Sequence, residues 1–265
     1  MSTTISVMTF NIRYNTEGDG PYQLRPYRYE YIDEYLRSFA ADVIGFQEVD
    51  KETQKDLAAT LSNYWVIGAG RMKNLSDESS CIAFNRDKFQ LLSCDTFWLS
   101  PTPGVCDSFP LDVFPGRVCT TVTLIPKREK GRDATPFRVY NTHLFHNADE
   151  RLCYYGVSVI LDRMLKDKQY ADYPAVLMGD FNSEPDSLAI RAIKEFKPLK
   201  LVDITYDAGY TYHEYENPDL KKTKIDYIFT DAEYDEDSID KVKARRKGDG
   251  MFLSDHYPIR AEILL

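Results

Sequence analysis

The sequence predicts an α/β protein in which two sheets' worth of β-strands are covered by amphipathic helices. Short runs of β-branched and aromatic residues recur along the 265 residues, as expected for strands. Helical periodicity appears between some of these runs. No Pro/Gly/Ser-rich linker, internal repeat or low-complexity stretch interrupts the chain. We therefore expect one domain spanning residues 1 to 265.

The expected strands are short, and most are rich in Val, Ile, Phe, Tyr and Thr. They lie at residues 5–12, 42–49, 81–85, 117–125, 137–144, 175–182, 224–231 and 258–265. Runs of this length and composition, separated by polar or helical segments, are typical of strands in mixed sheets.

Helices are expected where apolar side chains recur every three or four residues. Residues 27–39 and 152–165 show this spacing, which predicts two amphipathic helices covering a sheet. A third helix is expected after the strand at 175–182. There Ser183 and Asp186 offer capping oxygens, and Pro185 suits a first helical turn.

Composition limits the possible functions. There are 33 Lys and Arg against 42 Asp and Glu, so the net charge of -9 disfavours strong nonspecific binding to duplex DNA. No apolar run is long enough for a transmembrane helix and no signal peptide is evident, which predicts a cytoplasmic protein. The five cysteines lack CxxC spacing and are expected to be reduced thiols. A monomer is the expected oligomeric state.

Polar residues occur at the ends of several expected strands. They are Asn11, Gln47, Glu48, Asn141, His143, Asp180, Asn182 and Asp226. Taken singly, an Asn or Asp at a strand end is usually a turn former. Repetition of the pattern at several strand ends instead favours one shared polar site at the edge of the sheets.

Other kinds of site can be excluded from their motifs. The stretch "DFNSEP" begins like a calcium loop, but Pro185 and Arg191 occupy the positions that need Gly and Glu. The sequence has no GxxxxGK[ST], GxSxG or HExxH motif. In "HLFH", the two histidines would face opposite sides of a continuing strand.

The ordered motifs "VMTFNIR", "GFQEV", "YNTHL", "GDFN", "KIDYIF" and "SDHYP" resemble those of the endonuclease/exonuclease/phosphatase superfamily. This superfamily comprises metal-dependent phosphoesterases related to exonuclease III and DNase I. The stretches "FWLSPTP" and "YTYHEYE" are similar to compact bacterial-type members. The resemblance implies a four-layer α/β sandwich, in which two packed mixed β-sheets are flanked by helices.

The resemblance also implies roles for individual residues. Glu48 would be the principal ligand of Mg²⁺, or of Mn²⁺, with Asn11 and Asp255 nearby, directly or through water. Asp180 would orient or deprotonate the attacking water, and Asn182 would hold that water and a phosphate oxygen. His256, oriented by Asp226, would contact the scissile phosphate. The remaining expected contacts to substrate come from His143, Arg117 and Asn141, with a surface salt bridge as the alternative for Arg117.

The function expected first is Mg²⁺-dependent hydrolysis of a phosphodiester or phosphomonoester in a small phosphorylated molecule, a nucleotide or a lipid headgroup. The main alternative is a nuclease for RNA or single-stranded DNA, which needs a basic, aromatic-lined groove. A noncatalytic binding module is the alternative of another class. Leaving-group protonation has no evident residue, so a metal-bound water is a candidate. Substrate choice would depend on loops 13–26, 70–80, 101–117 and 145–150.

Overall fold

The computed structural model describes residues 3–15, 25–110, 113–127, 134–146, 149–246 and 248–265. For residues 25–27 it describes the backbone alone. Parts of the loops expected to choose the substrate, at 16–24, 111–112 and 147–148, therefore lie outside the described residues.

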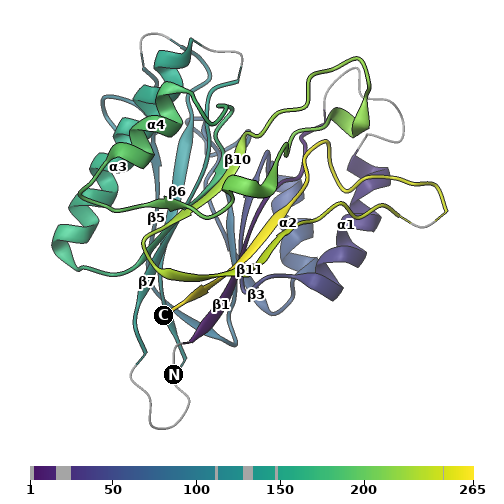
Figure 1. The fold of residues 1–265 in the computed structure, drawn as a ribbon, viewed down its shortest axis with the longest axis horizontal. Helices are drawn as coiled ribbons and strands as arrows, with labels where there is room; N and C mark the ends of the chain where they lie inside the picture. Colours follow the sequence, from purple (N-terminus) through teal and green to yellow (C-terminus); the bar gives the residue numbers. More distant parts are fainter. Residues whose placement is uncertain (1–2, 16–24, 111–112, 128–133, 147–148, 247) are drawn as a thin grey trace.

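The described residues form twelve strands. They are β1 (Thr4–Asn11), β2 (Val43–Gln47), β3 (Tyr64–Ile67), β4 (Ile82–Asn85), β5 (Phe89–Trp98), β6 (Val118–Pro126), β7 (Phe137–His143), β8 (Ala175–Asp180), β9 (Val202–Asp203), β10 (Asp226–Thr230), β11 (Glu233–Lys241) and β12 (Ile259–Leu264). The first sheet has the order β11-β12-β1-β2-β4-β3, and the second has the order β5-β6-β7-β8-β10-β9 (Figure 1).

Each sheet contains one parallel pair at its centre, and the remaining pairs are antiparallel. The parallel pairs are β1 with β2 and β7 with β8. The crossovers run through α1 (Arg25–Phe39) and α3 (Glu150–Tyr170). Because parallel strands end at the same edge, Asn11 lies in register with Gln47, and His143 with Asp180.

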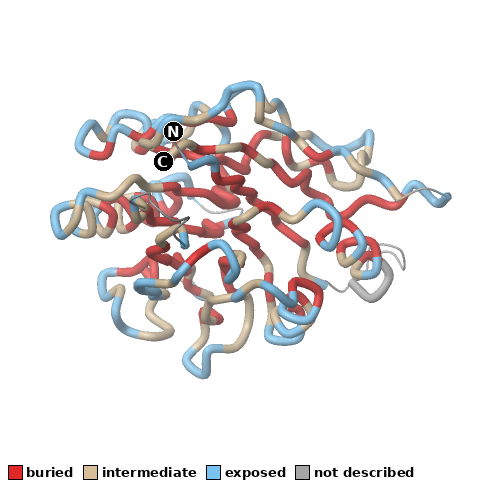
Figure 2. The backbone as a smooth tube through the Cα atoms, turned by 90° about the horizontal axis from the view of Figure 1, so that it is seen from below, coloured by how far each residue is buried: buried red, intermediate tan, exposed pale blue. Residues whose placement is uncertain are grey.

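The helices cover the outer faces of the two sheets. Apolar side chains of α1 and α2 (Lys51–Thr60) pack on the first sheet, and those of α3 and α4 (Leu188–Glu195) pack on the second. A third apolar cluster fills the space between the sheets. Figure 2 shows the resulting buried strands inside a shell of more exposed helices and loops. No helix in the described part of the chain is long and apolar enough to cross a membrane.

The two ends of the chain meet at the edge opposite the carboxyl ends of β1 and β2 (Figure 1). The backbone N–H of Thr3 donates to the carbonyl of Leu265 at 2.7 Å, and that of Leu265 donates to Thr3 at 3.0 Å. The antiparallel pair of β1 with β12 continues this contact, with Thr4 opposite Leu264.

The predicted fold class is confirmed, and a strand forms in each of the eight expected runs. The sequence did not predict α2 or the strands β3, β5, β9 and β11. β11 shows no hydrophobic pattern in the sequence, because it is a charged edge strand with no fully buried residue. The start of α4 was also placed too early, since Ser187 is its cap and accepts from the N–H of Ile190.

Candidate active site

A polar cleft of about 520 Å³ lies where the parallel strands of both sheets end. Its lining residues are Arg13, Tyr14, Glu48, Glu78, Arg117, His143, His146, Asp180, Asn182, Glu184, Tyr212, Lys221, Thr223, Ile225, Asp255 and His256. The described residues also form a larger groove of about 730 Å³ between α3 and α4. None of the strand-end residues lines that groove, so the cleft is the better candidate for chemistry.

The turn after β8 aims Asp180 and Asn182 into the cleft. Gly179 has a φ of 148°, and a Cβ there would lie 2.0 Å from the carbonyl oxygen of Thr142, so only glycine fits. Asn182 has a φ of 45°, and its backbone N–H donates to Asp180 Oδ1 at 2.9 Å. The side-chain amide of Asn182 donates to the carbonyl of Leu144 at 3.1 Å. The strand end is therefore a rigid mount for both residues.

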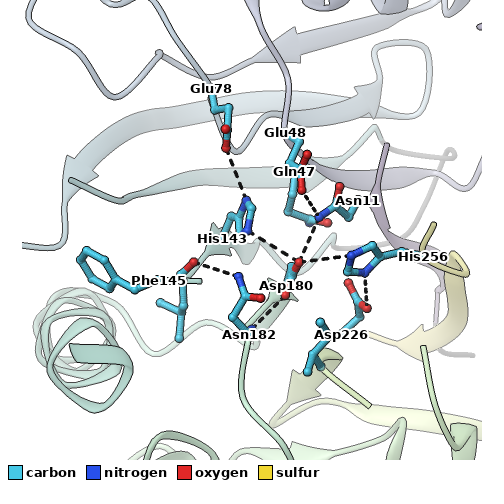
Figure 3. Close-up of polar contacts among 12 residues, drawn as sticks. Asn11, Gln47, Glu48, Glu78, His143, Phe145, Asp180, Asn182, Asp226 and His256 are labelled. Carbon is cyan, nitrogen blue, oxygen red and sulfur yellow. Dashed lines mark hydrogen bonds and ion pairs between the residues drawn. The ribbon is translucent and has the colours of Figure 1, made fainter. Parts of the chain in front are cut away.

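Three side chains converge on one carboxylate oxygen of Asp180 (Figure 3). Asn11 Nδ2 donates to Asp180 Oδ2 at 2.9 Å. The Nε2 atoms of His143 and His256 each lie 3.7 Å from the same oxygen. Burial and the neighbouring Asp226 carboxylate raise the pKa of Asp180. A basic carboxylate in a cleft, beside two imidazoles, is suited to accepting a proton.

His256 forms a tight pair with Asp226. Its Nδ1 lies 2.9 Å from Asp226 Oδ2, and Asp226 is opposite Asp180 in the pairing of β10 with β8. Burial by itself would lower the pKa of His256, but the Asp226 carboxylate raises it well above its ordinary value. Ligand atoms of these three residues also lie within 4.8 Å of one another, a spacing that a metal ion can bridge. Because Nδ1 of His256 is paired with Asp226 and its Nε2 faces Asp180, we interpret the cluster as an imidazole held between two carboxylates.

His143 faces a second carboxylate, Glu78, which the sequence did not predict. His143 Nδ1 lies 3.7 Å from Glu78 Oε2 and makes no hydrogen bond to the described residues. Burial, followed by the charge of Arg117, lowers the pKa of His143 well below its ordinary value. Glu78 also pairs with Arg71 at 3.2 Å, and burial raises the pKa of Glu78. This pair repeats the arrangement of Asp226 with His256 at a wider spacing.

The oxygen-rich side of the cleft comes from Glu48 and Asp255. Glu48 has a φ of 62°, and its carboxylate accepts from the N–H of Tyr14 at 2.6 Å and from Asn11 Nδ2 at 2.9 Å. Asp255 accepts from Ser254 Oγ at 3.0 Å through Oδ1. Its Oδ2 is buried without a hydrogen bond and lies 3.1 Å from Arg13 Nη1.

These carboxylates fit a hard divalent cation. Both line the cleft, and the incompletely satisfied Oδ2 of Asp255 is an available oxygen ligand. Asn11 lies between Glu48 and Asp180, and its amide nitrogen donates to both carboxylates. Its amide oxygen accepts from the N–H of Arg13 at 3.0 Å. Asn11 therefore joins the two carboxylates.

Arg117 and Asn141 were both expected to bind substrate, but the structure separates them. Arg117 lines the cleft, with its Nη1 3.6 Å from Glu78 Oε2, so it is not a surface salt bridge. Asn141 is fully buried and is not among the cleft-lining residues. Its amide bonds Gln47 and the carbonyls of Phe46 and Cys81, which leaves no contact for a substrate.

Several lining residues were not singled out from the sequence. They are Arg13, Tyr14, Glu78, Glu184, Tyr212, Lys221, Thr223 and Ile225. Most come from loops, where no strand-end pattern marks a residue as functional. His146, which a continuing strand would have placed opposite His143, also lines the cleft, because β7 ends at His143. Glu78 had a usable signal, since it lies three residues before the start of the expected strand at 81–85. The antiparallel bridge of Val49 with Ser79 then holds it beside the Glu48 segment.

Comparison with known proteins identifies the family. The chain has no match among curated protein sequences. A solved family protein from Bacteroides vulgatus is 27% identical, covers 98% of each chain and has a TM-score of 0.84. One from Bacteroides thetaiotaomicron is 24% identical over 100% of this chain and 98% of its own, also with a TM-score of 0.84. A mannosyl-6-phosphatase from the same species is 23% identical over 98% of this chain and 99% of its own, with a TM-score of 0.83.

The family model of the Endonuclease/Exonuclease/phosphatase family matches residues 8–256. The match begins at the second residue of "VMTFNIR", ends at the histidine of "SDHYP" and includes the four motifs between them. The chain belongs to the endonuclease/exonuclease/phosphatase family of phosphoesterases.

Proposed function

We propose that the protein is a divalent-metal-dependent phosphoesterase that hydrolyses a small phosphorylated molecule by in-line attack of an activated water. The observation that carries the proposal is the convergence of Asn11, His143 and His256 on one oxygen of Asp180. A carboxylate in this position can accept a proton from water while imidazoles bind the phosphate oxygens.

Glu48 and Asp255 would hold the metal ion, and Asn11 would fix Glu48 relative to Asp180. The charged side chains lining the cleft favour such an ion. Five carboxylates, from Glu48, Glu78, Asp180, Glu184 and Asp255, face only three Arg and Lys side chains among the lining residues. A phosphate ester needs more positive charge than this lining supplies. Glu48 and Asp255 would hold a Mg²⁺ or Mn²⁺ ion, which would supply that charge and would polarise a phosphoryl oxygen.

The two histidine pairs take different roles in this mechanism. His256, charged through Asp226, donates from Nε2 to a phosphate oxygen. Asp180 receives the proton of the attacking water, and Asn182 beside it holds that water. We assign protonation of the leaving oxygen to His143, whose Nε2 faces the site and whose Nδ1 faces Glu78. A bound phosphate dianion would raise the pKa of this imidazole and favour its protonated form. Arg117 contributes a further positive charge at the same end of the cleft.

A phosphorylated sugar is the first substrate class to test. The cleft volume of about 520 Å³ suits a ligand of this size. The named activity of the mannosyl-6-phosphatase with a similar fold makes a hexose phosphate a reasonable probe. The nuclease alternative is less favoured, because Tyr14 and Tyr212 are the only Tyr, Phe or Trp side chains among the lining residues that the structure describes.

Hydrolysis assays test the proposal directly. Mannose 6-phosphate, p-nitrophenyl phosphate, bis(p-nitrophenyl) phosphate and a single-stranded oligonucleotide should each be incubated with Mg²⁺, with Mn²⁺ and with EDTA. We expect EDTA-sensitive release of phosphate from the small esters and none from the Asp180→Asn variant. Cleavage of the oligonucleotide alone would favour the nuclease. Absence of turnover together with absence of Mn²⁺ binding would favour a noncatalytic module.

A further inference from the structure

The space between the two sheets is filled mainly by apolar side chains. Val7 and Val43 of the first sheet and Val139 and Met178 of the second belong to this buried cluster. Apolar contacts stabilise the packing but have no directional preference, so they tolerate small sliding movements of one sheet on the other. The proposed site takes residues from both sheets, and its geometry depends on their relative position.

Among the described residues, a polar connection crosses this apolar interface beneath the bond from Asn11 to Asp180 that joins the sheets at the cleft. Asn141 of β7 donates from Nδ2 to the carbonyls of Phe46 and Cys81, both at 2.8 Å. Its Oδ1 accepts from Gln47 Nε2 at 2.7 Å. Gln47 Nε2 also lies 3.1 Å from Thr9 Oγ1, so the connection reaches β1 as well as β2. Buried hydrogen bonds of this kind are directional and costly to break.

Gly45 makes room for the connection. A Cβ at position 45 would lie 2.6 Å from Asn141 Oδ1 and 2.9 Å from the methyl carbon of Met178. The methionine can move aside, but the Asn141 amide is held by its three hydrogen bonds. Because Gly45 of β2 has no side chain, the Asn141 amide of β7 can occupy this space.

The connection lies directly beneath the cleft. Asn141 is two residues before His143 and on the same face of β7, since alternate residues of a strand share a face. Gln47 is the residue immediately before Glu48 and ends β2. A shift at the amide pair would therefore reach cleft side chains of both sheets along one or two residues.

We propose that Asn141 is a positioning residue that sets the place of Glu48, on the first sheet, relative to His143 and Asp180 on the second. Through its bond to Gln47, Asn141 fixes the position of the Glu48 carboxylate, which would hold the metal ion. That position is set relative to His143 and Asp180. The inference rests on the proposed function, because it assigns the geometry of that same site. It gives Asn141 a role without substrate contact.

The test compares metal binding in variants that break the connection with one that only weakens the interface. Asn141→Leu removes the amide at similar volume, and Gly45→Ala displaces it while keeping every hydrogen-bonding group. Val139→Ala is the matched control, since Val139 lies on the same face of β7 within the apolar cluster. Mn²⁺ affinity is measured from the electron paramagnetic resonance signal of free Mn²⁺, together with kcat, KM and the thermal midpoint.

We expect Asn141→Leu and Gly45→Ala to weaken Mn²⁺ binding about tenfold or more and to lower kcat with little change in KM. Val139→Ala should lower the thermal midpoint while Mn²⁺ affinity stays within about twofold of the wild type. If Asn141→Leu does not fold, Gln47→Met is used in its place. This substitution removes the amide hydrogen bonds of Gln47, including the one to Asn141 Oδ1, and the same loss of Mn²⁺ affinity is expected.

Wild-type Mn²⁺ affinity in the folded Asn141 and Gly45 variants would overturn the inference and leave the proposed function standing. An equal loss in Val139→Ala would also overturn it, because metal affinity would then follow interface stability alone. A wild-type protein that neither binds Mn²⁺ nor hydrolyses a phosphoester would overturn the proposed function, and the inference with it.

Discussion

The first and second sheets share one spatial arrangement of strands but present different side chains at the same edge. In each sheet, a central parallel pair joined through a helix is flanked on either side by two further strands in antiparallel pairing. The parallel pair of the first sheet leads to Asn11 and Glu48, and that of the second ends in His143 and Asp180. Topology thus fixes where a site forms, and side-chain identity decides which part of the chemistry each sheet supplies.

The two sets of residues are also connected across the cleft. Asn11 of the first sheet bonds Asp180 of the second, and His256, which precedes β12 of the first sheet, pairs with Asp226 of the second. Substitutions in each sheet can therefore distinguish residues expected to bind the metal ion from residues expected to transfer protons.

The largest effect is expected from Asp180→Asn, which removes the proton acceptor of the second sheet. We expect kcat to fall by about 1,000-fold or more while Mn²⁺ affinity stays close to that of the wild type. The thermal midpoint at neutral pH should be equal or higher, because an ionised carboxylate with a raised pKa destabilises the folded state. Asp186→Asn, an exposed neighbour, is the control for the assay. Substantial remaining turnover would exclude Asp180 as the acceptor.

Glu48→Gln tests the first sheet in the same way. We expect Mn²⁺ to bind on the order of 100-fold more weakly, because an amide replaces a charged ligand. Part of the lost activity should return at high Mn²⁺ concentration, whereas activity of Asp180→Asn should not. Calorimetric titration with Mn²⁺ and rate measurements over a range of metal concentrations distinguish the two. Unchanged metal affinity would place the ion elsewhere.

Activity should fall more when the carboxylate partner of His256 is removed than when the carboxylate partner of His143 is removed. Asp226→Asn removes a carboxylate 2.9 Å from His256, so the pKa of His256 should fall and kcat should drop about 100-fold. Its activity should decrease further between pH 6 and pH 8, as the imidazole loses its proton. Glu78→Gln acts on a pair separated by 3.7 Å and should cost about tenfold without this added pH dependence. Equal losses and equal pH profiles would contradict the assignment.

The smallest effect concerns His213, which links the loop before β10 to the loop before β12. Its N–H donates to the carbonyl of Asp255 at 2.9 Å, and its ring stacks on Tyr257 with centroids 3.8 Å apart. Burial lowers the pKa of His213 to about 4. The unfolded chain therefore takes up a proton first as the pH falls below about 6.5.

His213 should consequently contribute a decrease of about 1 to 2 kcal/mol in the free energy of unfolding between pH 7 and pH 5, after allowing for solvent screening. Urea titrations at both pH values measure this change. In His213→Gln, which does not titrate, the decrease should be smaller by the same amount. An identical pH dependence in both proteins would show that another group is responsible.

The sequence predicted the fold class and seven of the sixteen described lining residues of the cleft, because the fold and most of these seven residues depend on strands. Asp180 follows an apolar run at the end of β8, and Asp226 precedes one at the start of β10. Glu78 and Arg13 lie in loops, and their approach to His143 and Asp255 depends on contacts between distant segments. The sequence also marks Asn141 as polar but cannot tell whether its amide faces the cleft or the opposite sheet, because His143 and Asn141 share one strand face.

The meeting of the chain ends has a practical consequence. Thr3 and Leu265 are hydrogen-bonded to each other at the start of β1, whereas Asn11 closes that strand at the cleft. The eight residues of β1 separate these points by about 26 Å at the usual rise of a strand. A short linker between residues 3 and 265 should thus yield a circularly permuted enzyme whose catalytic groups keep their places, with new ends opened in an exposed surface loop.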